Sequence, residues 1–281
     1  MKIAIASGKG GTGKTLVSVA LALSAPKPVR LIDCDVEEPN AAIFIKPQFN
    51  NEQDITILVP EVNIDKCDNC GKCSQICQFN AIITISEKTM VFENLCHSCG
   101  GCYLVCPQAA ISEIPKTIGK IKLGSGNGIE FVQGEVNVGE SVAIPAIKAA
   151  KRFGKEDKIN ILDSPPGTAC PMIETVKDAD YVLLVTDPTP FGVNDFKLAA
   201  EAVTNLGLPF GVLINRADLG DTSLDEYCKA NRIPIHLKID NDRLIAEAYA
   251  IGDTLFDVKP EYELSFRKLW DDIQLHLKDR K

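Results

Sequence analysis

The chain has 281 residues, of which 45% are hydrophobic and 24% charged, and its formal net charge at pH 7 is −8. This length is enough for a large buried core, and no apolar run reaches the ~20 residues that a membrane-spanning helix needs. The negative charge gives no broad attraction to nucleic acid or anionic lipid, so we expect neither as a stable partner. The chain opens without a secretion signal, so its eleven cysteines indicate a reducing, cytoplasmic location and metal binding.

A glycine-rich loop directly follows the first predicted strand, residues 2–6. Residues 8–15, GKGGTGKT, fit the pattern G-x-x-x-x-G-K-[ST], and the helix-like segment 13–24 continues from them. In this context backbone N–H groups bind phosphate oxygens, Lys14 reaches the terminal phosphates, and the Thr15 hydroxyl binds Mg²⁺. The predicted nucleotide-binding residues of this loop are Gly8, Lys9, Gly10, Gly11, Thr12, Gly13, Lys14 and Thr15.

Two later apolar runs, residues 29–33 and 159–163, end in carboxylates. Asp33 and Asp35 stand at positions i and i+2, so they face the same way at a strand tip, and Asp163 closes the second run. An acid after a strand is commonly only a turn or helix-cap residue. Three acids at strand tips beside a phosphate-binding loop weaken that alternative.

The loop KGGTGKT resembles the deviant Walker A loop of the MinD/ParA/Mrp and nitrogenase iron protein class of P-loop ATPases. The resemblance implies that Lys9 reaches across a homodimer to the partner's nucleotide, as an arginine finger does. It also implies that Asp35 orients the attacking water and that Asp33 and Asp163 hold Mg²⁺. The catalytic residues that we predict are Lys9, Lys14, Asp35 and Asp163.

Base recognition is expected after the strand-like run 210–214. Asn215 sits where this class reads adenine, and an amide offers adenine one donor and one acceptor. We assign Asn215 and Arg216 to the nucleotide site. The segment from Asn215 to Asp218 also fits the guanine-binding pattern N-[KR]-x-D, although the early lysine of the loop favours ATP over GTP.

Eight cysteines form two matching runs, each with the spacing C-x2-C-x2-C-x3-C. This spacing directs three thiolates to one iron–sulfur cube and the fourth to the other cube. We therefore predict two [4Fe–4S] clusters, one held by Cys67, Cys70, Cys73 and Cys106 and the other by Cys96, Cys99, Cys102 and Cys77. The alternative is a pair of structural zinc sites, although zinc usually takes pairs of ligands from separated segments.

Residues 61–117 resemble bacterial two-cluster ferredoxins, with Gln78 where that pattern has proline. Residues 55–60 and 118–124 are the expected paired strands at the two ends of this segment. We therefore predict an α+β ferredoxin-like domain, residues 61–117, inserted into a discontinuous P-loop domain formed by residues 1–60 and 118–281.

Strand-like runs alternate with helix-like segments in the rest of the chain, which predicts an α/β fold with a mostly parallel sheet flanked by helices. The strand-like runs are 2–6, 29–33, 159–163, 181–186, 210–214 and 233–239, and the helix-like segments include 13–24, 141–153, 193–206 and 222–230. The C-terminal segment 265–278 has one apolar stripe, expected to pack on the core, that consists of Phe266, Leu269, Trp270, Ile273 and Leu277.

These features together predict a Mg²⁺-dependent ATPase, slow on its own, that couples a nucleotide-driven dimer switch to low-potential electron transfer with a redox donor or acceptor protein. Two alternatives stay open: an iron–sulfur carrier ATPase of the Mrp type, whose C-terminal CxxC is missing here, and a redox-sensing MinD-like positioning ATPase. Cys34 and Cys170 are interpreted as small buried residues. The sequence assigns no role to Cys228.

Overall fold

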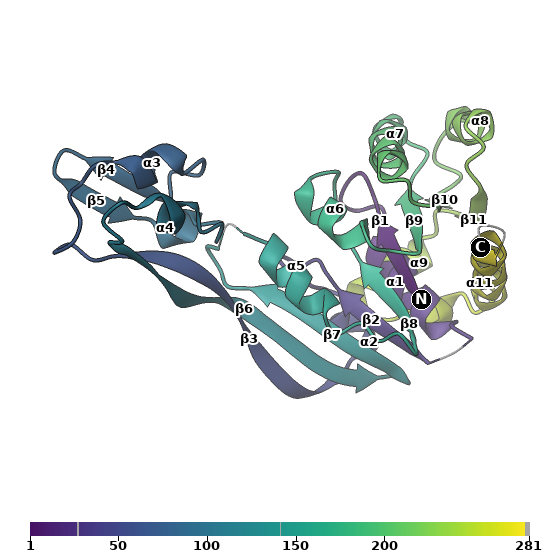
Figure 1. Cartoon of the computed structure of the whole chain (residues 1–281). Helices are drawn as coiled ribbons and strands as arrows, with labels where there is room; N and C mark the ends of the chain where they lie inside the picture. The colour runs from purple at the N-terminus through teal and green to yellow at the C-terminus, as the bar shows by residue number, and fades with distance from the viewer. Residues whose placement is uncertain (27, 141, 279–281) are drawn as a thin grey trace.

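The computed structural model describes residues 1–26, 28–140 and 142–278 (Figure 1). Its strands are β1 (Lys2–Ala6), β2 (Val29–Asp33), β3 (Gln48–Val62), β4 (Ile82–Ile85), β5 (Lys88–Val91), β6 (Ile111–Gly126), β7 (Ile129–Val136), β8 (Ile159–Asp163), β9 (Tyr181–Thr186), β10 (Phe210–Asn215) and β11 (Ile235–Ile239). In this part of the chain nine strands form one sheet in the order β11-β10-β9-β1-β8-β2-β7-β6-β3, and β4 pairs with β5.

Adjacent strands are parallel from β11 to β7, whereas β6 is antiparallel to both of its neighbours, β7 and β3. The mostly parallel sheet flanked by helices is therefore confirmed. The helices are α1 (Lys14–Leu23), α2 (Ala42–Ile45), α3 (Lys72–Ile76), α4 (Gly101–Val105), α5 (Ile144–Lys151), α6 (Cys170–Val176), α7 (Pro190–Asn205), α8 (Ser223–Ala230), α9 (Arg243–Ile251), α10 (Leu255–Val258) and α11 (Tyr262–Lys278), with a 3₁₀ turn, η1 (Glu93–Leu95). Residue 141, at the start of the predicted helix 141–153, lies outside the described residues.

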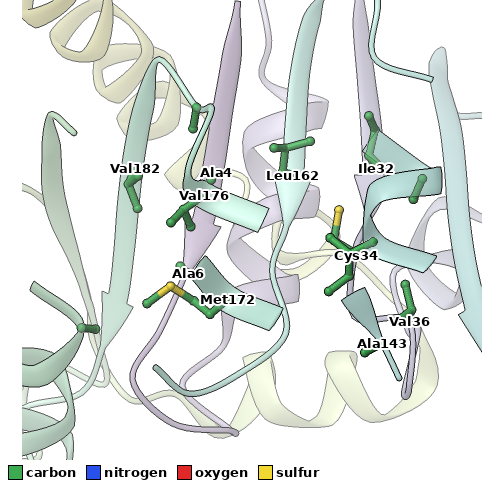
Figure 2. Close-up of a cluster of buried hydrophobic side chains, with 14 of the residues drawn as sticks. Ala4, Ala6, Ile32, Cys34, Val36, Ala143, Leu162, Met172, Val176 and Val182 are labelled. Carbon is green, nitrogen blue, oxygen red and sulfur yellow. The ribbon is translucent and has the colours of Figure 1, made fainter. Parts of the chain in front are cut away.

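The central strands are buried on both faces, which is why they read as continuous apolar runs in the sequence. Alternate residues enter two separate cores. One core contains Ala4, Ile32, Leu162 and Val182, and Figure 2 shows them with Met172 and Val176 of α6. The other core contains Ile3, Leu31, Ile161 and Leu183 together with side chains of α1 and α11.

Helix α11 packs on the second core, as the apolar stripe predicted. Phe266, Leu269, Trp270 and Ile273 are at most 1% exposed. The Trp270 indole N–H also donates a hydrogen bond of 3.1 Å to the carbonyl oxygen of Leu21 in α1, which satisfies the polar end of a buried ring. No helix in the described part of the chain is both long and apolar enough to cross a membrane.

Strands β3 and β6 are much longer than the predicted runs 55–60 and 118–124, and the neighbouring strand β7 was not predicted. The last residue of β7, Val136, lies opposite Gly119, and from Thr117 to Ile111 strand β6 pairs only with β3. We call this two-stranded part, residues 56–62 and 111–117, the arm. Residues 63–110, which we call the cysteine module, lie at the outer end of the arm (Figure 1).

The arm leaves the sheet on the same side as the carboxyl ends of the parallel strands. Strand β7 runs parallel to β2 and ends at Val136. Because β6 continues beyond this point toward Ile111, the arm extends past the edge where β1, β2 and β8 also end. The cysteine module and the glycine-rich loop between β1 and α1 therefore belong to the same edge of the sheet.

Candidate functional site

The glycine-rich loop connects β1 to α1, and two of its glycines allow close contacts with other elements. A Cβ atom on Gly8 would lie 2.1 Å from the backbone oxygen of Asp195 in α7, and one on Gly13 would lie 2.5 Å from the side-chain nitrogen of Asn215. Gly13 also has a φ of 95°, which favours glycine. The loop is therefore fixed between α7 and the end of β10, with Lys14 and Thr15 in the first turn of α1.

Asp163 has the environment expected of a residue that faces a bound cation. The residue is 1% exposed, and one carboxylate oxygen accepts a hydrogen bond of 2.8 Å from the Ser18 hydroxyl. The other carboxylate oxygen is buried and has no hydrogen-bond partner among the described residues. The Thr15 hydroxyl lies beside the same carboxyl group. An unpaired oxygen atom at this place fits Mg²⁺ or a water molecule bound to Mg²⁺.

Asp33 lies next to Asp163 in the sheet but has different partners. Its carboxylate accepts hydrogen bonds of 3.1 Å from the backbone N–H groups of Asp35, Asn40 and Ala41. These bonds close the loop after β2 over the strand end. Asp33 is fully buried, and the structure thus gives it the turn-forming role as well as a place beside the predicted Mg²⁺ site.

Lys14 and the acids balance one another's charge in this partly enclosed site. Burial lowers the pKa of Lys14, while Asp163, Asp35 and Asp33 raise it. Burial, and then the negative charge of Asp163, raise the pKa of Asp35 to about 6. A carboxyl group with this pKa changes its ionisation close to neutral pH, which suits a residue that orients or deprotonates water.

Lys9 does not extend into solvent but pairs within its own chain. Its ammonium nitrogen lies 3.1 Å from the carboxylate of Asp187 and 3.4 Å from the Thr189 hydroxyl. Burial raises the pKa of Asp187, but hydrogen bonds from Thr189 and Lys9 outweigh this effect and lower it. No motif in the sequence pointed to Asp187, although this residue directly follows β9 and so also lies at a strand end.

A cavity of about 250 Å³ opens beside the glycine-rich loop. The amide nitrogen of Asn215 donates to the Thr12 carbonyl at 2.9 Å, and its amide oxygen accepts from the Arg216 N–H at 3.0 Å, so this side chain also secures the loop. The cavity is lined by Gly11, Gly13, Leu16, Asn215, Arg216, Asp240, Asn241, Asp242, Ile245, Ala246 and Tyr249. The sequence did not point to the lining residues that come from α9 and from the loop before it, because no motif marks these residues.

The cysteine module gathers the eight cysteines around two hollows. Cys67, Cys70, Cys73 and Cys106 line the first hollow. Cys77, Cys96, Cys99 and Cys102 line the second. In each hollow three cysteines come from one run and the fourth comes from the other run, which is the crossed arrangement that the spacing predicts.

The backbone around the hollows repeats as the sequence does. Asn69 and Gly71 have φ angles of 56° and 73°, and the equivalent residues Ser98 and Gly100 have φ angles of 53° and 71°. Backbone N–H groups point at sulfur in both runs: Ala81 donates to Cys77 and Ala110 donates to Cys106, each at 3.3 Å. Hydrogen bonds from backbone N–H groups to cluster-bound sulfur are one of the features that set the reduction potential of an iron–sulfur cluster.

Among the residues that the structure describes, no three His, Cys, Asp or Glu side chains converge on a position for a single metal ion. A four-iron cube has a different requirement, because each cysteine binds its own iron at a separate corner. Cysteines that surround a hollow fit that requirement. The set of donor residues around each hollow is therefore suitable for a [4Fe–4S] cluster.

The three remaining cysteines lie outside the module. Cys34 is fully buried among apolar side chains (Figure 2), and burial raises the pKa of its thiol. Cys228 is also buried. The interpretation of Cys170 as a buried residue was wrong: it is exposed, because it begins α6, whose buried side consists of Met172, Thr175 and Val176.

Comparison with known proteins identifies the class. Residues 3–255 match the family described as the CobQ/CobB/MinD/ParA nucleotide-binding domain, and the chain belongs to this family. Members of the MinD/ParA group are P-loop ATPases, and the predictions of this class and of a nucleotide-binding ATPase are thereby confirmed in general terms.

Two relatives match nearly the whole chain. MJ0579 of Methanocaldococcus jannaschii, an uncharacterized protein, is 31% identical over 259 residues, which are 90% of this chain and 91% of the relative. MJ0578 of the same organism, also uncharacterized, is 33% identical over 274 residues, or 96% of each chain.

Solved structures share the fold at lower identity. The septum site-determining protein MinD of Pyrococcus horikoshii, complexed with Mg-ADP, is 19% identical with a TM-score of 0.57, and the match covers 97% of this chain and 95% of that one. A variant of McdA from Cyanothece, in complex with ATP, is 17% identical with a TM-score of 0.58, and the match covers 97% of this chain and 96% of that one.

We expect Asp35→Asn to stabilise the protein in the absence of nucleotide and Mg²⁺. The folded state raises the pKa of Asp35 from 3.8 to about 6, so ionising this group opposes folding. This cost is complete above pH 6 and absent below pH 3.8. It corresponds to about 3 kcal/mol, which solvent screening reduces to about 1–2 kcal/mol for a partly exposed group.

Urea denaturation at pH 7.5 and at pH 4 measures this effect. The variant should be more stable than the wild type at pH 7.5, and the two should converge toward pH 4. A variant that is less stable at pH 7.5, or a difference that does not depend on pH, would contradict this account of Asp35.

Proposed function

We propose that the protein is an ATPase that couples nucleotide binding and hydrolysis in a homodimer to low-potential electron transfer through two [4Fe–4S] clusters. Family membership accounts for the ATPase part. The observation that carries the redox part is the crossed grouping of eight cysteines around two hollows. Both parts lie along one edge of the same sheet, which supports a coupling between them.

The phosphate groups of ATP would lie on the backbone N–H groups of residues 8–15, with Lys14 beside the terminal phosphates. Thr15 and Asp163, one of whose carboxylate oxygens has no hydrogen-bond partner among the described residues, would hold Mg²⁺. Asp35, with its pKa of about 6, would orient the attacking water. Asp33 supports this arrangement by holding the loop that carries Asp35.

The base of the nucleotide would occupy the cavity beside Gly13 and Tyr249. A guanine-binding N-[KR]-x-D site needs a free aspartate carboxylate for the base. Here an oxygen of that aspartate, Asp218, accepts a hydrogen bond of 2.6 Å from the backbone N–H of Asn241. The second oxygen of Asp218 stays available in the described part of the chain, so the preference for ATP over GTP rests on the early lysine of the loop, Lys9.

The proposed homodimer requires Lys9 to change partners. In the structure Lys9 pairs with Asp187, whose side chain is 4% exposed. If Lys9 leaves to reach the partner's nucleotide, Asp187 keeps only its hydrogen bonds from Thr189. Loss of the ion pair opposes dimer formation, and the attraction between Lys9 and the phosphates of the partner's ATP would offset it.

When bound, each [4Fe–4S] cluster would accept one electron from a donor protein and release it to an acceptor protein. The two crossed cysteine sets of this chain would hold the clusters, and the N–H groups of Ala81 and Ala110 would donate to the sulfur atoms of Cys77 and Cys106. Electron transfer weakens steeply with distance. Movement of the module at the end of the arm would therefore control delivery.

The crossed ligand sets can be tested with two double variants. We expect Cys70→Ala/Cys106→Ala, which alters a single hollow, to retain about four irons per chain after anaerobic reconstitution. Cys70→Ala/Cys77→Ala alters both hollows and should lose both clusters. Iron and sulfide analysis measures the result. If Cys70→Ala/Cys106→Ala lost both clusters and Cys70→Ala/Cys77→Ala kept one, each run would bind its own cluster. Zinc bound in a stoichiometric amount would contradict the cluster assignment.

Lys9→Ala should bind ATP but should turn it over roughly 1,000-fold more slowly, because the charge that stabilises the transferred phosphoryl group is removed. It should also fail to form an ATP-dependent dimer. Phosphate release and analytical ultracentrifugation measure these effects. Asp187→Asn is the matched variant, because it keeps Lys9 but removes the carboxylate that pairs with it. Lys9 then has no ion pair with Asp187 to break, so dimer formation should need less ATP than in the wild type. ATP turnover by Lys9→Ala equal to that of the wild type would contradict the role of Lys9.

The coupling itself is tested by redox titration of the reconstituted protein with and without MgATP. We expect MgATP to change the midpoint potential of at least one cluster, and Lys14→Ala to remove this change. Transfer of intact clusters to an apo-acceptor would instead support a carrier ATPase. Clusters that neither respond to MgATP nor transfer would favour a redox-sensing positioning ATPase.

A further inference from the structure

The root of the arm is a place where its angle can change. The register between β3 and β6 pairs Ile55 with Gly119 but Thr56 with Thr117, so Ile118 is an extra residue in β6. Such a bulge bends a strand and increases its twist. Strand β7 ends opposite Gly119, and beyond that point the ribbon has only two strands. Two-stranded ribbons twist more freely than wider sheets.

One side chain just outside the bulge connects the cysteine module to the nucleotide-binding part. The Lys116 ammonium lies 2.9 Å from the carboxylate of Glu140, in the loop after β7. It also donates a hydrogen bond of 2.6 Å to the side-chain oxygen of Asn94. Asn94 lies in η1, two residues before Cys96, which lines the second hollow.

The loop that carries Glu140 is bonded in turn to the loop that carries Asp35. The N–H group of Val136 donates to the carbonyl of Val36, the residue after Asp35, at 2.9 Å. The next residue, Asn137, donates to Ile118 at the bulge at 2.8 Å and accepts from the N–H of Glu140 at 3.1 Å. A continuous set of contacts therefore joins Asp35 to Lys116.

The ion pair of Lys116 differs from the Lys120–Glu52 pair, which β6 also makes. Its side chains are 15% and 9% exposed, whereas those of Lys120 and Glu52 are 49% and 46% exposed. Solvent and salt screen a sheltered pair less than an exposed one. The Lys120 pair also joins two neighbouring strands and reaches neither the module nor the loop after β7. It serves as a matched control.

We infer that Lys116 and Glu140 are positioning residues that set the angle of the arm and transmit the nucleotide state of the Asp35 loop to the Cys96 side of the module. This inference rests on the proposed function. A nucleotide that binds differently to two positions of the Asp35 loop shifts Val36, the loop after β7 and Glu140 together. Lys116 follows Glu140 and carries Asn94 with it.

The test compares Lys116→Met, Glu140→Gln and the control Lys120→Met with the wild type, all as reconstituted full-length protein. Hydrogen exchange of the backbone amides in residues 93–98 and the cluster midpoint potentials are measured with and without MgATP. In the wild type MgATP should change both. Lys116→Met and Glu140→Gln should reduce the MgATP-dependent difference in exchange about 5-fold or more, with unchanged iron content and ATP binding.

Lys116→Arg, which retains the charge, should restore most of the response, and Lys120→Met should behave as the wild type. A full response in Lys116→Met would overturn the inference and leave the proposed function intact. An equal loss of the MgATP response in Lys120→Met would also overturn the inference, because removal of a lysine charge elsewhere on β6 would then have the same effect. A wild type that does not respond to MgATP in either measurement would refute the proposed coupling and the inference with it.

Discussion

The balance of charge at the carboxyl edge of the sheet is the constraint on which the rest of the structure depends. Lys14 is 7% exposed and lies among Asp33, Asp35 and Asp163, and burial alone would make each of these charges unfavourable. Burial raises the pKa values of Asp163 and Asp35. One carboxylate oxygen of Asp163 also has no hydrogen-bond partner among the described residues. A phosphate group and a divalent cation would complete this balance of charge. Without them the buried charges lower the stability of the folded protein at this site, which favours ligand binding.

The same edge supports the proposed response of the distant cysteine module to a nucleotide. Because β6 runs antiparallel to β7, the arm extends from the side of the sheet where the phosphate-binding loop lies. The loop after β2 is bonded both to Asp33 and to Val136, which is the last residue of β7. The proposed nucleotide site and the arm therefore share a network of backbone hydrogen bonds. The side chain of Lys116 extends this network to the cysteine module.

The cysteine module shows how local sequence and chain pairing act together. The repeated run of cysteines produces the repeated backbone conformations at Asn69 and Ser98, which are local properties. The exchange of the fourth cysteine between the hollows depends on the contact of the two runs, and the pairing of β3 with β6 brings the ends of the module together. Two short cysteine motifs become one unit because the two runs meet around the hollows, while the ribbon of β3 and β6 holds the ends of the module together.

The sequence by itself determined the glycine-rich loop, the acids at the strand tips, the two cysteine runs and the buried stripe of α11, because each depends on residue spacing within one element. It determined the parallel sheet through the alternation of strand-like and helix-like runs. It did not reveal β7, whose apolar residues are interrupted by Gln133 and Gly134, or the exposure of Cys170. Only the tertiary structure decided that Lys9 pairs with Asp187, that Asn215 secures Thr12, and that Lys116 meets Glu140. These contacts join residues that are far apart in the chain or on different elements, and their positions depend on how strands pair across the whole sheet.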